Sequence, residues 1–253
     1  MLAVERHLKI VDYINMNKSA RVSELSKMFS VTEETIRRDL EKLEKKGKLL
    51  RSHGGAVVVQ SSDKIETSFS EREVTNVLEK SQIAEEAIKL IEENNKIILD
   101  ASSTAWYMAK KLPNIPLTVM TNSIKVAMEL NEKSNITVIS TGGTLLSKSL
   151  SFVGSLAESS FDLYHFDKAF ISCSGIDIKK GLTESNEQQA RIKEQIIKNV
   201  DVVNLMIDHT KFHKISFSKI CNMSEIDYLI TDKTIDDRLE QKCLEDEINV
   251  VYI

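Results

Sequence analysis

Two spacings of hydrophobic residues divide the chain. In the first 45 positions they recur every three or four residues, as in helices that bury one face. Three helices are predicted, and they share one small core. The second of them ends at the turn Ser30-Val31. The hydrophobic positions that mark the three helices are Val4, Leu8, Val11 and Ile14, then Val22, Leu25, Met28 and Phe29, then Ile36, Leu40 and Leu43.

The third predicted helix also has a polar, basic face. Thr32 is a good N-cap for it, and the polar face carries Thr35, Arg37, Arg38, Lys42 and Lys45. Such a helix suits the DNA major groove, where Arg can bind guanine with two hydrogen bonds and Thr can meet a thymine methyl group or a phosphate. A solvated helix face is the alternative for an isolated basic pair. The two helices upstream favour a helix-turn-helix instead.

A short hairpin is predicted directly after this helix. Gly47 ends the helix, and residues 49–51 can pair with 56–58 around His53-Gly54-Gly55, because glycine accepts the positive φ of tight hairpins. The N-terminal domain is therefore predicted to be an α+β winged helix-turn-helix. Its expected DNA-contacting residues are Thr32, Glu34, Thr35, Arg37, Arg38, Lys42, Arg51, His53 and Gly54.

Two acidic residues complicate this interpretation. Glu33 and Glu34 would repel phosphate at the groove. They either favour the positive N-terminus of the helix or accept a hydrogen bond from cytosine.

The charge distribution indicates that the two parts of the chain have different functions. Residues 1–60 contain 12 Lys and Arg against 8 Asp and Glu, a net charge of +4, which leaves −8 for the remainder of a chain whose total is −4. The protein is thus no general polybasic binder, and specificity must come from docking a defined helix. One such helix covers few base pairs, so we expect a homodimer or tetramer on paired half-sites.

The remaining chain is long enough for a second domain. The helix-and-wing pattern stops before the polar run of residues 60–64. We predict a DNA-binding domain at 1–58, a linker at 59–75, and an effector-sensing and oligomerisation domain at 76–253.

In the second domain, short hydrophobic runs alternate with amphipathic stretches. Strands are predicted at 96–99, 117–120, 136–139, 168–171 and 202–207, with further strands at 228–230 and 250–253. Helical patterns cover 83–91, 123–130 and 188–197. This alternation predicts an α/β domain with a mostly parallel sheet.

Small or polar residues follow each of the five strands predicted between residues 96 and 207. Ligands of open α/β sheets bind at the carboxyl ends of the strands, and hydroxyls before a helix or a Gly-Gly pair suit an anion. Taken singly, these residues could be turn formers or solvated charges. Together they predict a site for a phosphorylated small molecule, with candidate residues Asp100, Ser102, Ser103, Thr104, Thr121, Asn122, Gly142, Gly143, Lys148, Gly175, Asp177, Lys193, Asp208 and Lys211.

No metal site or cofactor is expected. His209 and His213 are four residues apart beside Asp208, but that spacing suits metal ligation on a helix, whereas this segment is predicted to leave a strand. The three cysteines form no CxxC motif, and Cys173 is expected to be a small core residue. Free thiols, the lack of an apolar run of about 20 residues and the lack of a signal peptide predict a cytoplasmic protein.

The motifs in order resemble those of the deoxyribonucleoside repressor (DeoR) family of bacterial transcription regulators. They are TIRRDL at 35–40, RSHGGA at 51–56, TN at 121–122, TGG at 141–143, SFVG at 151–154, GID at 175–177, GLT at 181–183 and D-x-T-K at 208–211. The resemblance implies a winged-helix repressor of a carbohydrate-utilisation operon. It also implies a C-terminal domain related to ribose-phosphate isomerases that senses a sugar phosphate.

The chain departs from the family where D-S-G-T-T is usual, because residues 100–104 are Asp-Ala-Ser-Ser-Thr. This difference leaves the identity of the effector open. Three functions remain in view. The first is a repressor controlled by a sugar phosphate. The second is an isomerase-like enzyme tethered to DNA, with Asp100, Glu184, Asp208 or Lys211 as acid or base. The third is a ligand-independent DNA-binding protein whose second domain only oligomerises.

Overall fold

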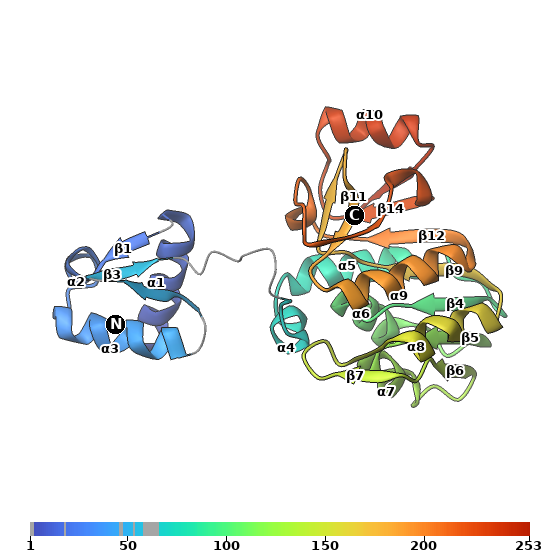
Figure 1. Cartoon of the computed structure of the whole chain (residues 1–253), viewed down its shortest axis with the longest axis horizontal. Coiled ribbons are helices and arrows are strands. Elements are labelled where there is room, and N and C mark those ends of the chain that lie inside the picture. Colours follow the sequence, from blue (N-terminus) through green and yellow to red (C-terminus); the bar gives the residue numbers. More distant parts are fainter. Residues whose placement is uncertain (1–2, 18, 46–47, 53, 58–65) are drawn as a thin grey trace. The chain divides into compact units, whose positions relative to one another are not determined.

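The computed structural model describes residues 3–17, 19–45, 48–52, 54–57 and 66–253. The chain divides into two compact units, Met1–Ser62 and Asp63–Ile253. Figure 1 shows the helices and strands of both units.

The first unit packs three helices against a small antiparallel sheet. The helices are α1 (Ala3–Asn17), α2 (Val22–Phe29) and α3 (Glu33–Lys45), and the strands are β1 (Ser19–Arg21), β2 (Leu50–Ser52) and β3 (Gly55–Val57), in the order β1-β3-β2. Ile36, Leu40 and Leu43 of α3 are all buried, as their spacing predicts. The predicted winged helix is confirmed, with β2 and β3 as its wing. Gly47, His53 and Val58, which entered the prediction, lie outside the described residues.

Two expected core residues of this unit lie on its surface instead. Leu8 is 64% exposed and Met28 is 46% exposed. In α1 the buried side is shifted because Arg6 turns inward to an ion pair with Asp39, and Ile10 and Ile14 complete that face. A hydrophobic period cannot reveal a buried arginine, so this difference was invisible in the sequence.

Strand β1 was not predicted, and Gly55 explains how it fits. A Cβ atom at Gly55 would stand 2.2 Å from the Ala20 carbonyl oxygen, so only glycine allows β3 to approach β1 this closely.

The second unit is built on a seven-stranded sheet of order β15-β14-β12-β9-β4-β5-β6. Every strand pairing in it is parallel. The chain starts at β4, moves outward through β5 and β6, and returns to β9 on the other side of β4. The topological switch point therefore lies between β4 and β9. The strands are β4 (Lys96–Leu99), β5 (Leu117–Thr121), β6 (Ile136–Ser140), β9 (Phe166–Ile171), β12 (Val200–Met206), β14 (Tyr228–Thr231) and β15 (Asn249–Tyr252).

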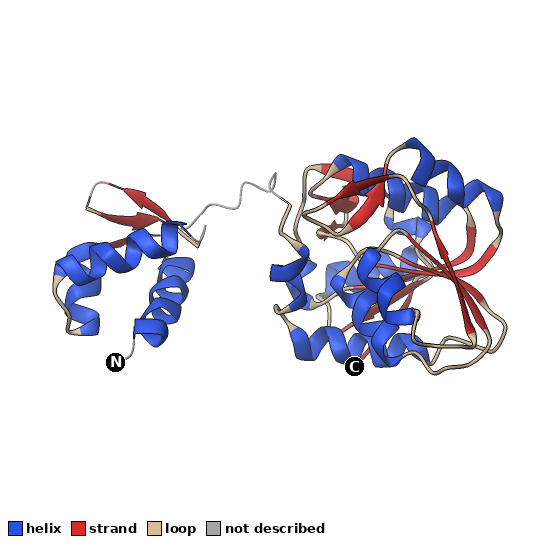
Figure 2. Cartoon of the chain, turned by 90° about the horizontal axis from the view of Figure 1, so that it is seen from below, coloured by secondary structure: helices blue, strands red, loops and turns tan. Residues whose placement is uncertain are grey.

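Helices cover both faces of this sheet (Figure 2). Neighbouring residues of one strand point to opposite faces: Ile97 and Leu99 pack in one core, Ile98 in the other. The first core includes α5 (Val77–Ile88), α6 (Ser103–Lys111) and α7 (Ile124–Leu130). The second includes α8 (Ser155–Ser160), α9 (Glu187–Lys198) and α10 (Asp237–Glu245). The predicted α/β class is confirmed.

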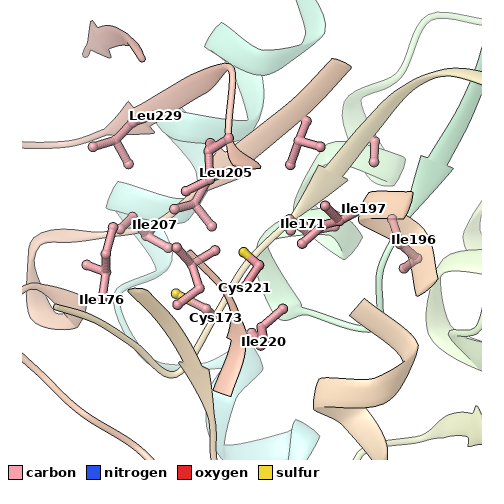
Figure 3. Close-up of a cluster of buried hydrophobic side chains, with 14 of the residues drawn as sticks. Ile171, Cys173, Ile176, Ile196, Ile197, Leu205, Ile207, Ile220, Cys221 and Leu229 are labelled. Carbon is pink, nitrogen blue, oxygen red and sulfur yellow. The ribbon is translucent and has the colours of Figure 1, made fainter. Parts of the chain in front are cut away.

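Short antiparallel strands add to the second core. They form the sheets β10-β11-β13 and β7-β8, with β7 (Thr144–Leu146), β8 (Ser151–Val153), β10 (Gly175–Asp177), β11 (Gly181–Glu184) and β13 (Ser218–Cys221). Figure 3 shows Cys173 and Cys221 among isoleucines and leucines of this core. Burial raises the pKa of the Cys173 thiol to about 12, so Cys173 is the inert core residue that was predicted.

The chain enters the second unit earlier than the predicted boundary at residue 76. Helix α4 (Phe69–Glu73) lies within the predicted linker of 59–75, but Phe69 is fully buried against Trp106 of α6. Residues 66–75 therefore belong to the second unit. The error arose because five residues are too few to show a helical period.

Three short 3-10 helices complete the second unit, η1 (Phe161–Leu163), η2 (His209–Lys211) and η3 (Met223–Glu225). Within the described ranges, the structure has no helix with the length and hydrophobicity needed to span a bilayer.

Candidate functional site

The exposed face of α3 is the candidate DNA-binding surface. The Thr32 hydroxyl accepts a hydrogen bond from the Thr35 amide at 3.2 Å, which makes Thr32 the predicted N-cap, and the two hydroxyls lie 2.9 Å apart. Glu34, Arg37, Arg38 and Lys42 are exposed along the same helix. The structure thus leaves the predicted contact residues of α3 accessible.

The two acidic residues of α3 pair with its arginines one turn later. Arg37 donates to Glu33 at 2.8 Å and Arg38 donates to Glu34 at 3.3 Å. Exposed pairs of this kind contribute about 0.3–0.5 kcal/mol each. The arginines can therefore leave them at little cost when a guanine or a phosphate is available. In the free protein, the acids neutralise the basic face.

We expect Glu33→Gln with Glu34→Gln to raise affinity for non-operator DNA more than affinity for operator DNA. Removing two negative charges strengthens attraction to any phosphate backbone, while base contacts stay unchanged. Titration of both DNA types at several salt concentrations measures this. Glu187→Gln, which breaks a similar exposed pair with Arg191 in α9, is the matched control. An unchanged ratio of the two affinities would show that the acids have no role in selectivity.

A buried ion network holds α3 against α1. Asp39 accepts from Arg6 at 2.6 Å and lies 2.8 Å from the His7 Nε2 atom. Burial opposes ionisation of Asp39, but these two partners outweigh it and lower the pKa of the carboxyl group. The basic face of α3 is therefore presented on a rigid support.

The wing contains the remaining predicted DNA-contacting residues. Arg51 is exposed on β2, and its backbone amide donates to Glu44 at 2.9 Å. Gly54 has a φ of 88°, as a tight hairpin requires. His53 lies outside the described residues.

In the second unit, the carboxyl edge of the sheet beside the switch point contains a buried charge triad. The Lys193 ammonium of α9 is 2.9 Å from Asp100, which follows β4, and 3.0 Å from Glu184 of β11. The remaining Asp100 oxygen lone pairs accept from the amides of Ser102 at 3.0 Å and Ser172 at 2.9 Å. All three triad members are less than 10% exposed.

The triad is internally satisfied. Burial opposes the charge on Glu184, but Lys193 and hydrogen bonds from Ser174 and Ser185 hold the pKa of Glu184 at about 2. Burial also opposes the charge on Lys193, yet Asp100 and Glu184 raise the pKa of its ammonium above the usual range. Asp100 and Lys193, both predicted to contact an effector, thus form an ion pair with each other. Asp100 also holds the loop that begins α6.

The serines and threonine after Asp100 begin α6. Ser102 is the N-cap, and its hydroxyl accepts from the Ala105 amide at 3.0 Å. Ser103 and Thr104 form the first helical positions, where backbone N–H groups have no partner within the helix. The predicted hydroxyl cluster is therefore located at a helix N-terminus next to the switch point, a suitable place for an anion.

The next strand end has one polar atom without a partner. Thr121 accepts from the Ser123 amide, and Asn122 donates from its side chain to the Phe152 carbonyl at 3.1 Å. The Asn122 Oδ1 atom is buried and has no hydrogen-bond partner within the described chain. Asn122 can therefore still accept a hydrogen bond from a ligand hydroxyl.

Several other predicted contacts have structural explanations. A Cβ atom at Gly143 would meet the Val153 carbonyl at 2.7 Å, and one at Gly175 would meet the Lys214 carbonyl at 2.4 Å, so close packing requires both glycines. Gly142 has a φ of 64° in the same turn. The Asp177 carboxylate accepts from the amides of Lys179 and Lys180 in the β10–β11 turn, so it stabilises that turn. Lys148 is exposed.

Three cationic side chains at the same edge have no carboxylate partner among the residues that the structure describes. Lys80 is 6% exposed and donates to the backbone carbonyls of Arg72 and Thr75, both at 2.6 Å. Arg72 donates to the Ala101 carbonyl at 3.5 Å, and its Nε atom is buried without a partner among the described residues. Lys211 forms no ion pair with any of the residues that the structure describes, although it is close enough to lower the pKa of Lys80.

Asp208 is an acidic group that interacts electrostatically with both Lys80 and Lys211. Its carboxylate accepts from Asn76 at 3.1 Å and from Thr210. Burial opposes its charge, but Thr210 and Lys211 lower the pKa of Asp208. Arg72, Asn76 and Lys80 were missed by sequence analysis because they lie in or near the predicted linker, before the first strand. The sequence feature that could have indicated them is Lys80, which lies on the same side of α5 as the buried Ile83, Ala84 and Ala87.

The two histidines considered for metal binding each pair with a separate aspartate. His209 Nδ1 is 2.5 Å from Asp232, and His213 pairs with Asp236. Among the described residues, no group of three His, Cys, Asp or Glu side chains is arranged to hold a metal ion.

Comparison with known proteins identifies both units. Residues 6–62 match the DeoR-like helix-turn-helix domain, and residues 75–233 match the DeoR C terminal sensor domain. The chain belongs to the DeoR family. It is 56% identical to the uncharacterized HTH-type transcriptional regulator YulB of Bacillus subtilis over 98% of this chain and 95% of the relative. It is 39% identical to the L-fucose operon activator of Haemophilus influenzae over 96% and 97% of the two chains.

This DeoR-family protein is accordingly a DNA-binding transcriptional regulator with a sensor domain. A ribose 5-phosphate isomerase from Methanocaldococcus jannaschii is similar to it with a TM-score of 0.41, 18% identity and coverage of 55% of each chain. The matched DNA-binding domain contains α3 and its wing. The matched sensor domain contains the triad, the α6 N-terminus and the cations Lys80 and Lys211, whereas Arg72 lies just before it.

Proposed function

We propose that this regulator is a repressor of a carbohydrate-utilisation operon and that a sugar phosphate bound at the carboxyl edge of the sheet controls it. The observation that carries the proposal is the cation cluster of Arg72, Lys80 and Lys211 beside the N-terminus of α6. A buried ammonium without a carboxylate partner is costly, and a bound phosphate would compensate it. The sugar operon named for the Haemophilus influenzae relative supports a carbohydrate effector.

The proposed site has two functional parts. Arg72, Lys80, Lys211 and the first amides of α6 bind the phosphate. Asn122 and Asp208, which can accept hydrogen bonds, orient the sugar hydroxyls. Asp100, Lys193 and Glu184 keep the α6 loop in position. The carboxylates of Asp100 and Glu184 are already engaged in ion pairs and hydrogen bonds within the protein. Ligand binding is therefore favoured over the acid–base catalysis of the tethered-enzyme alternative.

We propose further that the protein acts as a homo-oligomer. One α3 helix contacts only a few base pairs, so operator affinity needs two copies on paired half-sites. The ligand then acts by binding more tightly to the state with the weaker DNA affinity.

Fluorescence anisotropy of a labelled operator tests this function. The DNA upstream of the protein's own and neighbouring genes is titrated with protein, alone and with fructose 1-phosphate, fructose 6-phosphate, ribose 5-phosphate, glycerol 3-phosphate or L-fucose 1-phosphate. The unphosphorylated sugars are the controls. We expect one phosphorylated compound to release the DNA. Specific binding that no compound alters, together with unchanged thermal stability, would favour the ligand-independent alternative.

Effector binding should weaken as pH rises above about 8. Burial lowers the pKa of Lys80 to about 8, despite attraction from Asp208 and Glu79, while Lys211 and Arg72 lower it further. A bound phosphate favours the charged ammonium, so binding takes up a proton, and the Kd should rise up to about tenfold per pH unit above 8. Calorimetric titration between pH 6.5 and 9.5 measures this. Lys80→Gln should bind weakly at every pH, whereas the exposed control Lys198→Gln should keep the slope.

A further inference from the structure

The first described residues of the sensor unit include part of the proposed effector site. Residue 66 directly follows the segment that connects the sensor to the DNA-binding unit. Within residues 66–80, Arg72 donates to Ala101 after β4 and Asn76 donates to Asp208 after β12, both at the carboxyl edge of the sheet. This entry segment, defined as residues 66–80, contains α4, the first turn of α5 and two of the three unpaired cations. Any ligand of Arg72 and Lys80 therefore contacts the part of the sensor that is nearest in sequence to the DNA-binding unit.

The start of the entry segment is attached by contacts that do not involve the cations. Asn186 donates to Glu66 at 3.1 Å, and the Phe69 amide donates to the Lys148 carbonyl at 2.8 Å. The Phe69 ring is fully buried, with its centroid 6.0 Å from that of Trp106.

The middle of the segment is fixed by two residues from other helices. Tyr107 of α6 donates to the Glu73 carbonyl at 2.8 Å. Lys125 of α7 pairs with the Glu73 carboxylate at 3.1 Å and stands 5.4 Å from the Phe69 ring centroid.

The end of α4, in contrast, is held by the proposed effector-binding group itself. The Lys80 ammonium donates to the carbonyls of Arg72 and Thr75, and Asn76, which follows Thr75, donates to Asp208. A phosphate bound by Lys80 competes with those two carbonyls for the same N–H donors. A helix of five residues has little stability of its own, so α4 depends on these outside contacts.

We propose that the entry segment is the element through which the bound sugar phosphate acts on the DNA-binding unit. The phosphate withdraws the Lys80 ammonium from the carbonyls of Arg72 and Thr75 and the Arg72 guanidinium from the Ala101 carbonyl, and α4 moves together with the residues that precede it in the entry segment. This inference rests on the proposed function, because it assumes that the anion binds at the cation cluster. It adds the element, the entry segment, through which ligand binding would change the affinity for DNA.

The test separates ligand binding from the response. Tyr107→Phe with Lys125→Gln removes the hydrogen bond and the ion pair that hold Glu73 at the end of α4, and it leaves Arg72, Lys80 and Lys211 in place. Lys110→Gln is the matched control: Lys110 is also on α6 and lies over the Trp106 ring at 4.5 Å, but it has no hydrogen bond to α4. Ligand affinity is measured by calorimetry and operator affinity by anisotropy, with inorganic phosphate and each of the five phosphorylated compounds.

We expect the double variant to bind the active compound within about threefold of the wild-type Kd. Its operator affinity should respond at least fivefold less to that compound, within the usual range of allosteric coupling. The control should respond as the wild type does. Normal binding with a full response in the double variant would overturn the inference while leaving the proposed function intact. No binding of any compound to the wild type would overturn both.

Hydrogen exchange on the wild type provides a second measurement if the double variant does not fold. Amides of residues 66–76 should change protection when the compound binds, whereas amides of β9 in the centre of the sheet should not. A bound compound that leaves residues 66–76 unchanged would also overturn the inference.

Discussion

Replacing Arg38 with alanine weakens operator binding by about 1–3 kcal/mol, or roughly 5- to 150-fold, if the guanidinium group contacts a base. Arg38 is exposed on α3, and its partner Glu34 holds it only in a surface ion pair. The loss should therefore come from DNA contacts, with thermal stability and sugar-phosphate binding unchanged. Anisotropy on operator and single-base operator variants measures both the affinity and the base preference at the contacted position.

Arg191→Ala is the matched control for this experiment. Arg191 is an exposed arginine of α9 that also pairs with an acid four residues earlier, at 2.7 Å. It should leave operator affinity unchanged. If Arg38→Ala binds the operator normally, α3 does not use this arginine, and the assignment of the basic face fails at that position. An equal loss on all DNA sequences with a smaller salt dependence would instead assign Arg38 to a phosphate.

Lys193→Met destabilises the sensor unit by about 3–5 kcal/mol, because it leaves Asp100 and Glu184 buried without their shared cation. For a unit of this size, the expected fall in Tm is about 6–20 °C. Thermal unfolding followed by circular dichroism measures it. Lys198→Met, on the same helix but exposed and paired with Glu194 at 2.6 Å, should change the Tm by only a degree or two.

The pH dependence of stability gives an independent check on the triad. The pKa of Glu184 is held at about 2 in the folded protein, below its value in the unfolded chain. Its stabilising contribution is therefore present above about pH 4.5 and is lost as pH falls toward 2. In Lys193→Met the carboxylate loses its main charge partner, so acid unfolding should begin at higher pH. A wild type and variant with the same acid midpoint would show that the triad does not control it.

Local sequence patterns were sufficient for much of the fold. The spacing of Ile36, Leu40 and Leu43 predicted the buried side of α3, and Thr32 predicted its start. The predicted strands of the central sheet match β4, β5, β6, β9, β12, β14 and β15 within two residues at each end. These predictions succeeded because helix caps and buried strands depend on residues close together in the chain.

The arrangement of the candidate effector site was harder to predict from the sequence. Residues that follow predicted strands, such as Asp100, Thr121 and Asp208, do lie at strand ends and are buried. The strand ends could not show that Asp100 is occupied by Lys193, which is 93 positions away in the sequence. They also could not bring Arg72 and Lys80 to the carboxyl edge of the sheet, because both precede its first strand.

The amino-acid sequence by itself determined the two domains, the winged helix, the alternation of strands and helices, and the motifs shared with the DeoR family. Hydrophobic period, capping and turn chemistry act over a few residues, so they can be recognised without a fold. The tertiary structure alone decided which charges are neutralised and which remain available. An ion pair such as Lys193 with Asp100, or an unpaired ammonium such as Lys80, depends on distances between remote segments, and only the packed chain sets those distances.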